Sequence, residues 1–399
     1  MPKDDRLAVH TVVMDGEEVA YGDIGVSDEE RAAAGRETMA ERQKSLLARN
    51  RRRARRRYRR PLPKGMECAR VWRRREPEEL RRRLTDGPLA VWSEDDVLHV
   101  LWRGDEPRLS AGVQLAMWPV RGADDLWELS VRIRRLEEAV ISVVAATSHR
   151  PHEQPVERLW RGALAAPAPP SSAPLLGTVT EHVVDSSRLG RPRAITVYRP
   201  PGPAGPMPLC LHADGQSVPG SAPYVDAAVA AGTLPPLLLV GLHCDRTPGP
   251  YPDGRTREYI PGVDPDRFAA HLAFAVDEVL PRFPEATHVI SAGFSNGASF
   301  ALGAADRRPD RIAAAVALSP NLPPPELDVT VRAPRYLAAG TIESGFRDCA
   351  RDLAAILSGA GIAHRHEEWV GGHDPYWWWV HLVEGLRWIL RDALPAAHP

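Results

Sequence analysis

Short apolar runs alternate with amphipathic stretches of helical length over the second half of the chain. Five runs have the continuous apolar character of buried parallel strands: 207–213, 236–243, 288–294, 313–319 and 335–341. Helical patterns follow them at 265–281, 295–307, 346–358 and near 376–390. This alternation is typical of an α/β domain in which helices cover both faces of a mostly parallel sheet.

The pattern before this domain has period two. Between residues 88 and 147, short β-branched and aromatic segments are separated by turn-like stretches: LAVW, VLHVLW, GVQLAMW, LWELSVRI and AVISVVAAT. Several short strands at this spacing predict a small antiparallel β-sandwich. A helix is expected to begin at Pro77, because proline suits the first helical position and Glu78 and Glu79 suit the first turn.

These patterns divide the chain into four parts. A basic extension that we expect to be flexible covers 1–65, the β-sandwich 66–150, a Pro/Ala-rich linker 151–176 and the α/β domain 177–399. The extension carries 11 basic residues and no acid between Arg42 and Arg60. Over the whole chain, 51 basic and 52 acidic residues nearly cancel, so nucleic acid is not an expected partner.

Cysteine usage and hydropathy indicate the compartment. The four cysteines are scattered without paired spacing, so we expect neither a disulfide framework nor a metal site. The N-terminus has no apolar leader segment, and no apolar run reaches 18 residues. We therefore expect a cytoplasmic protein with no membrane partner, and no motif requires a cofactor.

One stretch carries the chemistry. An apolar strand leads into Gly293-Phe294-Ser295-Asn296-Gly297, and an alanine-rich helix follows at once. This is the G-x-S-x-G pattern in the strand–turn–helix context that gives it meaning. The turn holds the Ser295 hydroxyl at a helix N-terminus, where free N–H groups favour developing negative charge. We interpret Ser295 as a nucleophile; the alternative is a structural tight turn.

A nucleophilic serine needs a base, and the base needs an acid that orients it. His373 lies in a glycine-containing loop near the C-terminus, where this fold places the base. Two carboxylates compete for the acid. Glu343 follows a strand directly, whereas Asp348 lies within the next helix. We favour Glu343, because active sites form at the carboxyl ends of parallel strands.

Acyl transfer also requires backbone donors for the oxyanion. The N–H of Asn296, the residue after the nucleophile, is one candidate. The other should come from the loop at 211–216, where Gly215 permits a close backbone approach. A plain β-turn in that loop is the alternative.

Five ordered motifs resemble a known family. HADGQ at 212–216, RTREY at 255–259, GFSNG at 293–297, GTIE at 340–343 and GGHD at 371–374 are similar to those of enterochelin (ferric-enterobactin) esterases, a branch of the esterase D-like α/β hydrolases. The resemblance covers about residues 88–395. It implies an α/β-hydrolase domain, and an N-terminal β-sandwich that shapes access for a bulky substrate.

The resemblance also implies roles for residues. It makes Ser295 the nucleophile, His373 the base and Glu343 the acid, and it adds Gln216 to Gly215 and Asn296 in the oxyanion hole. Candidates for substrate binding are Arg255 and Glu258 of the R-x-x-E box, and Trp377 in a run of three tryptophans. Arg255 could bind a carboxylate or catecholate oxygen, or it could instead pair with Glu258.

Three functions compete. The first is a serine esterase that opens ester or lactone bonds of a small molecule such as a ferric siderophore. The second is an esterase or acyltransferase of the same fold that acts on a carbohydrate or biosynthetic ester. The third, from another class, is a non-catalytic binding protein that uses the basic N-terminal arm, although the arm lacks aromatic interleaving beyond Tyr58.

Overall fold

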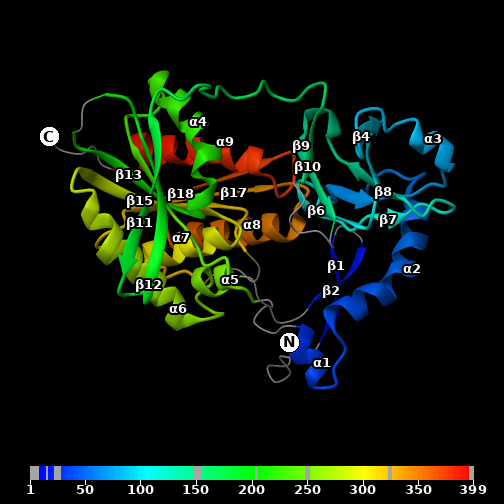
Figure 1. Cartoon of the computed structure of the whole chain (residues 1–399), viewed down its shortest axis with the longest axis horizontal. Helices are drawn as coiled ribbons and strands as arrows, with labels where there is room; N and C mark the ends of the chain where they lie inside the picture. The colour runs from blue at the N-terminus through cyan, green and yellow to red at the C-terminus, as the bar shows by residue number, and fades with distance from the viewer. Residues whose placement is uncertain are drawn as a thin grey trace. The chain divides into compact units, whose positions relative to one another are not determined.

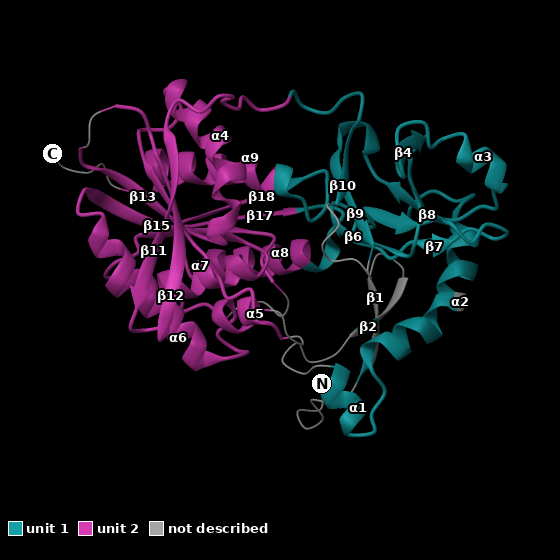
Figure 2. Cartoon of the chain, in the orientation of Figure 1, with its two compact units in different colours: residues 1–167, 340–345, 368–376 teal, residues 168–339, 346–367, 377–399 magenta. Residues whose placement is uncertain are grey.

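The computed structural model describes residues 9–14, 17–21, 28–147, 155–202, 205–247, 252–321 and 326–394. The chain divides into two compact units (Figure 2). Unit 1 comprises residues 1–167 together with 340–345 and 368–376, and unit 2 comprises the remainder. Two short segments far along the chain therefore belong to the N-terminal unit. They contain Glu343 and His373.

Unit 2 is built on an eight-stranded sheet of order β11-β12-β14-β13-β15-β16-β17-β18. The pairs β13–β14, β13–β15, β15–β16 and β16–β17 are parallel, whereas β11, β12 and β14 pair in antiparallel fashion. The bounds are β11 Thr178–Ser186, β12 Arg191–Arg199, β13 Met207–Ala213, β14 Leu238–Leu242, β15 Ala286–Phe294, β16 Ala314–Leu318, β17 Arg335–Gly340 and β18 His364–Trp369.

Helices cover both faces of this sheet (Figure 1), with α4 and α9 on one side and α6, α7 and α8 on the other. Their bounds are α4 Val218–Ala230, α5 Gly254–Tyr259, α6 Pro265–Ala273, α7 Asn296–Arg307, α8 Ser344–Gly359 and α9 Pro375–Trp388. Successive residues of the central strands point to opposite faces, and both sets are buried, which explains why these strands are apolar throughout. The five predicted strands are confirmed to within two residues.

Unit 1 contains two antiparallel sheets. One has the order β10-β9-β6, and the other has the order β3-β8-β5-β4 with β7 paired to β8. Alternate residues of both sheets, such as Leu98, Val131, Ile141 and Val143, share one apolar core. The bounds are β3 Cys68–Arg70, β4 Leu89–Glu94, β5 Val97–Arg103, β6 Pro107–Ala111, β7 Trp118–Pro119, β8 Leu126–Ile133, β9 Val140–Thr147 and β10 Val156–Arg161.

Two segments of unit 1 differ from the sequence-based expectation. GVQLAMW does not form a continuous strand, because β6 ends at Ala111 and Gly112 turns the chain with a φ of +64°; only its last residue, Trp118, belongs to a strand, β7. Residues 156–161, assigned to the linker, instead form β10 and pair with β9. Their alternating pattern VERLWR fits an edge strand, and the linker composition begins only after it. Residues 151–154 of the predicted linker lie outside the described residues.

The predicted N-terminal extension contains a hairpin of β1 His10–Met14 and β2 Glu17–Tyr21, and helices α1 Asp28–Ala33 and α2 Met39–Arg57. Thr38 and Glu41 form a capping box at the start of α2. Leu46, Asn50 and Ala54, spaced by four, are buried. The Ala54 carbonyl accepts the Trp72 N–H at 3.2 Å. The basic stretch is thus a helix packed on unit 1 rather than a free arm; residues 1–8 lie outside the described residues. Helix α3, Pro77–Arg81, begins where the sequence predicts.

Candidate active site

Ser295 lies at a sharp turn between β15 and α7. Its backbone has a φ of 55° and a ψ of −127°, a conformation that costs about 1–3 kcal/mol and that the surroundings must enforce. A Cβ at Gly293 would lie 2.2 Å from the Gly297 carbonyl oxygen, so the turn closes only with glycine there. The Ser295 N–H donates to the Leu318 carbonyl at 2.9 Å. The side chain is partly exposed. Sequence and structure agree on a strained, accessible serine.

Two tryptophans of α9 pack on the residue before Ser295. The ring of Trp378 stacks on Phe294, with centroids 4.1 Å apart and planes 7° from parallel. Trp379 meets the same ring edge-on at 5.6 Å. The Trp378 indole N–H donates to the Ser319 hydroxyl at 2.9 Å. These contacts fix the end of β15, and they explain part of the tryptophan run as packing.

Trp377, the tryptophan predicted to bind substrate, has a neighbour on its own helix. Its ring lies 6.0 Å from that of His381, which in turn contacts the Tyr336 hydroxyl at 2.7 Å through Nδ1. Trp377 and His381 are four residues apart, so they lie on the same face of α9. Trp377 is half-buried, and its role in substrate binding stays a prediction.

The loop after β13 is held in an unusual conformation beside α7. Asp214 has a φ of 59°, in the left-handed region that non-glycine residues rarely adopt. Its N–H donates to the Tyr259 hydroxyl at 2.8 Å. Arg255 grips its carboxylate in a fork, with Nε–Oδ1 at 2.7 Å and Nη2–Oδ2 at 2.6 Å. A Cβ at Gly297 would lie 3.0 Å from the Ala213 Cβ, which shows how close this loop lies to the nucleophile turn.

The fork also fixes the charge of Asp214. Burial alone would raise the pKa of this carboxyl, but the Arg255 guanidinium outweighs the burial and holds the pKa below its usual range. Gly215 packs so closely on β14 that a Cβ would lie 2.4 Å from the Gly241 carbonyl oxygen. The Gln216 side chain donates to the Asp214 carboxylate at 3.2 Å. The loop is therefore a rigid backbone turn rather than an open one.

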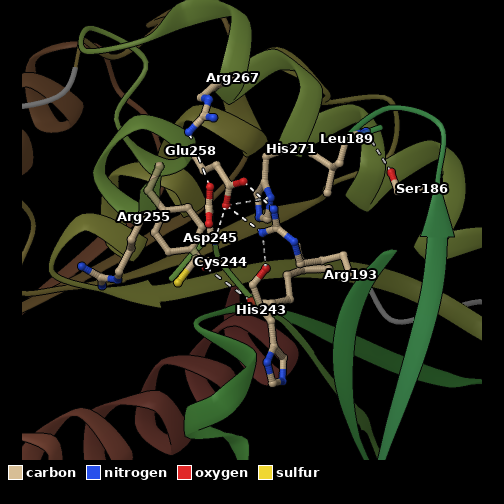
Figure 3. A network of polar contacts seen from close by, with 12 residues as sticks. Ser186, Leu189, Arg193, His243, Cys244, Asp245, Arg255, Glu258, Arg267 and His271 are labelled. Atoms are coloured by element: carbon tan, nitrogen blue, oxygen red, sulfur yellow. Dashed lines mark hydrogen bonds and ion pairs between the residues drawn. The ribbon is translucent and has the colours of Figure 1, made fainter. Parts of the chain in front are cut away.

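Arg255 and Glu258 do not pair with each other, and this corrects the R-x-x-E interpretation. Figure 3 shows Arg255 pointing away from Glu258. Glu258 is 3% exposed and accepts two hydrogen bonds from Arg193, at 2.8 and 2.6 Å, and a third from the Asp245 N–H at 2.7 Å. A carboxylate with these partners is structural, so substrate binding by Glu258 is not supported. Arg255 binds the Asp214 carboxylate rather than that of Glu258.

Glu343 and His373 lie together in unit 1. The Glu343 Oε2 atom is 2.6 Å from His373 Nδ1, and its Oε1 atom accepts the Gly340 N–H at 2.6 Å. Both side chains are buried. Asp348, the competing acid, has a side chain that is 58% exposed and lies 2.8 Å from Arg347. Of the two carboxylates, only Glu343 contacts the histidine.

The contacts of two residues with Asp214 were not predicted from the sequence. Tyr259 and Arg255 both bind Asp214, and their i, i+4 spacing on a short helix was the only local sign that they share a partner. Arg193, the partner of Glu258, lies 65 residues away, and nothing in the sequence links the two.

Within the described residues there is no group of three or more His, Cys, Asp or Glu that could hold a metal. No described helix combines the length and apolar character needed to span a membrane.

No protein-family model matches the sequence, and no curated protein matches it. Among solved structures, the chain is similar to the enterobactin esterase of Shigella flexneri, with a TM-score of 0.58 and 16% identity over 78% of this chain and 97% of that chain. The ferric enterobactin esterase of Salmonella typhimurium gives a TM-score of 0.55 and 18% identity over 78% and 98%. The predicted resemblance is confirmed in the fold, which is what similarity at this identity establishes. The chain therefore has the fold of the enterobactin esterases.

Proposed function

We propose that the chain is a serine esterase that opens ester or lactone bonds of a siderophore-like natural product. In this proposal Ser295 is the nucleophile, His373 the base and Glu343 the acid that orients it. The backbone N–H groups of Asn296 and of the loop containing Gly215 and Gln216 stabilise the oxyanion. The alternative of a non-catalytic protein that uses a basic arm is less well supported, because the arm includes helix α2, whose Leu46 and Ala54 are buried.

The hydrogen bond between Glu343 and His373 is the observation that carries the proposal. A carboxylate only accepts hydrogen bonds, so Nδ1 carries the ring proton and Nε2 keeps its lone pair. That is the tautomer a general base requires. Ser295 directly follows β15, Glu343 lies three residues after the last residue of β17, and both strands are parallel to β16. Carboxyl ends of parallel strands meet at one edge of a sheet, where ligands of such folds bind.

The reaction proceeds through an acyl-enzyme. The Ser295 hydroxyl oxygen attacks the ester carbonyl while His373 Nε2 takes the hydroxyl proton. The tetrahedral oxyanion receives N–H groups, among them that of Asn296, the first residue of α7, which has no acceptor within the helix. His373 gives the proton to the leaving alcohol. A water molecule then attacks the acyl-enzyme carbonyl while His373 Nε2 takes its proton. His373 returns this proton to the Ser295 oxygen, and the acid product leaves.

The substrate class is the finer part of the proposal. The Shigella flexneri enterobactin esterase has been crystallised in the presence of enterobactin and of 2,3-dihydroxy-N-benzoyl-serine. The five motifs shared with that family support a substrate of the same kind. Carbohydrate esters, biosynthetic esters and alcohol acceptors are the competing outcomes, and parallel assays with enterobactin and such esters separate them.

Hydrolysis of a p-nitrophenyl ester by the full chain tests the reaction. Ser295→Ala should lower kcat by on the order of 10⁴–10⁶-fold, because the attacking oxygen is lost. A serine-directed phosphonate should add to Ser295, as located by mass spectrometry. Ser358→Ala, an exposed serine on α8, is the matched control and should behave as the wild type. A Ser295→Ala protein that keeps more than about a tenth of the activity would overturn the nucleophile assignment.

A further inference from the structure

Asp374, the residue after His373, is a buried carboxylate with two separate tasks. It is 0% exposed. Its Oδ1 atom accepts the Tyr376 N–H at 2.9 Å, in the first turn of α9, as a helix N-cap does. Its Oδ2 atom accepts the backbone N–H of Ser142, in the middle of β9, at 2.5 Å. The second contact spans 232 positions of the chain, and no helix cap needs it.

The contact with Ser142 is part of a longer join between the His373 loop and the β10-β9-β6 sheet. Gly112, just after β6, exchanges both backbone hydrogen bonds with His373, at 2.9 and 3.2 Å. The Val140 N–H at the start of β9 donates to the Val370 carbonyl at 3.3 Å. Ile342 and Val370 also enter the apolar core of unit 1. The loop that carries His373 is thus fastened to the N-terminal β domain on both sides of the histidine.

Close packing fixes the register between the His373 loop and the β10-β9-β6 sheet. A Cβ at Gly112 would lie 2.0 Å from the Ser142 carbonyl oxygen, and a Cβ at Gly372 would lie 2.1 Å from the Gly112 carbonyl oxygen. On the other flank of the loop, the Ile342 N–H donates to the Gly371 carbonyl at 3.0 Å. Ile342 precedes Glu343 directly, so the same backbone ladder sets the separation of the histidine and its acid.

We propose that Asp374 is a positioning residue: by binding the Ser142 N–H it ties the backbone of His373 to β9 and keeps the imidazole against Glu343. This inference rests on the proposed esterase function. In consequence the N-terminal β domain is part of the catalytic apparatus and does more than shape substrate access. Burial raises the pKa of the Asp374 carboxyl, and the hydrogen bonds from Ser142 and Tyr376 offset part of that rise by favouring the charged form.

The test separates the two tasks of the carboxylate. In Asp374→Ser the short hydroxyl still caps α9, but it does not reach the Ser142 N–H. We expect kcat for a p-nitrophenyl ester to fall about 10–100-fold, with KM changed less than about threefold, since a small misplacement of the base costs rate rather than binding. Asp264→Ser is the matched control. Asp264 also precedes a proline, Pro265, and caps its helix α6 by accepting the Arg267 N–H. Within the described residues, no hydrogen bond joins its side chain to a strand.

A double-mutant cycle distinguishes positioning from general stability. If Asp374 acts through the His373–Glu343 pair, Asp374→Ser should cost less than about threefold once Glu343→Gln is present. Fully multiplicative losses would overturn the proposal, and so would an Asp374→Ser protein with the kcat of the control. If Asp374→Ser does not fold by circular dichroism, Asp374→Asn takes its place. Failure of both to fold would assign Asp374 to the stability of unit 1 and also overturn the proposal.

The Ser295→Ala protein keeps the two proposals apart. If Ser295→Ala is inactive and Asp374→Ser is unaffected, the esterase mechanism stands and the positioning role falls. If Ser295→Ala remains active, the esterase mechanism itself falls, whatever Asp374→Ser does.

Discussion

Among the described residues of unit 1, two histidines are buried, and their hydrogen-bond partners differ. His373 has a carboxylate, Glu343, at its Nδ1 atom. His99, on β5, has the Ser130 hydroxyl 2.7 Å from Nδ1 and the Arg75 guanidinium 3.0 Å from Nε2. Glu94 binds Arg75 at 2.8 Å. His99 therefore has a serine and an acid near it, but the Arg75 guanidinium, 3.0 Å from Nε2, lies closer to the histidine than Glu94 Oε2, which is 3.7 Å from the same atom.

That cation decides the chemistry. Arginine only donates hydrogen bonds, so His99 Nε2 must accept and Nδ1 must carry the proton toward Ser130. No lone pair then faces the serine, and Ser130 cannot be activated. Burial, together with the nearby positive charges of Arg75, Arg73 and Arg83, lowers the pKa of His99 to about 2. The comparison teaches that the partner of the imidazole determines whether a buried histidine can be a base. Glu343 accepts a hydrogen bond from His373, whereas Arg75 donates one to His99 and occupies its lone pair.

Replacing each histidine by the same residue gives the largest contrast. His373→Gln should lower kcat/KM for a p-nitrophenyl ester by on the order of 10⁴-fold or more, because the base is gone. His99→Gln should leave that value within about threefold and instead lower the free energy of unfolding by about 1–3 kcal/mol, since Arg75 and Ser130 lose a buried partner. Ester kinetics and urea unfolding of both variants check this. Loss of hydrolysis in His99→Gln with the fold intact would break the contrast.

The two carboxylates named by the sequence sharpen the same point. Glu343→Gln keeps the shape but lets an amide N–H face His373 Nδ1, so the ring no longer has a fixed tautomer. We expect kcat to fall by on the order of 10²–10⁴-fold. Asp348→Asn changes an exposed side chain and should stay within about twofold of the wild type. Equal losses in the two variants would mean that contact with His373 is not what matters.

The smallest effect concerns pH and stability. The pKa of His99 is about 2 in the folded chain and about 6.5 when unfolded, so the folded state binds fewer protons between these values. Stability should therefore decrease as the pH falls below 6.5, and His99 alone should contribute about 2 kcal/mol of loss between pH 7 and pH 5. The difference between the free energies of unfolding at pH 7 and pH 5, measured with urea, should be smaller by this amount in His99→Gln than in the wild type. An unchanged difference would show that the pKa of His99 is not lowered in the folded chain.

The sequence predicted the order of strands and helices in unit 2, because buried parallel strands are continuously apolar and the helices between them are amphipathic. It also predicted Ser295, since the glycines on either side of a serine between strand and helix report a local steric need. Glu343 and His373 were predicted from their places after strands. All of these are local patterns, legible within a few residues.

The predictions that were wrong concern partners far apart in the chain. The helix at 39–57 was expected to be flexible, because its buried stripe of Leu46, Asn50 and Ala54 is thin and its arginines dominate the pattern. Arg255 was expected to bind substrate or to pair with Glu258. Its carboxylate partner is Asp214, 41 positions away, whereas Glu258 pairs with Arg193, and substrate binding by Arg255 stays a prediction.

The sequence by itself thus determined the fold class and the chemical groups available: a serine at a strained turn, a histidine, and a carboxylate after a strand. Only the tertiary structure decided which groups meet. It joined Glu343 to His373 rather than Asp348, gave Glu258 to Arg193, and fastened the His373 loop to β9 through Asp374. The reason is physical. Strand, helix and turn preferences arise from neighbouring residues, whereas the partner of a buried charge is set by which distant segment packs over it and excludes water.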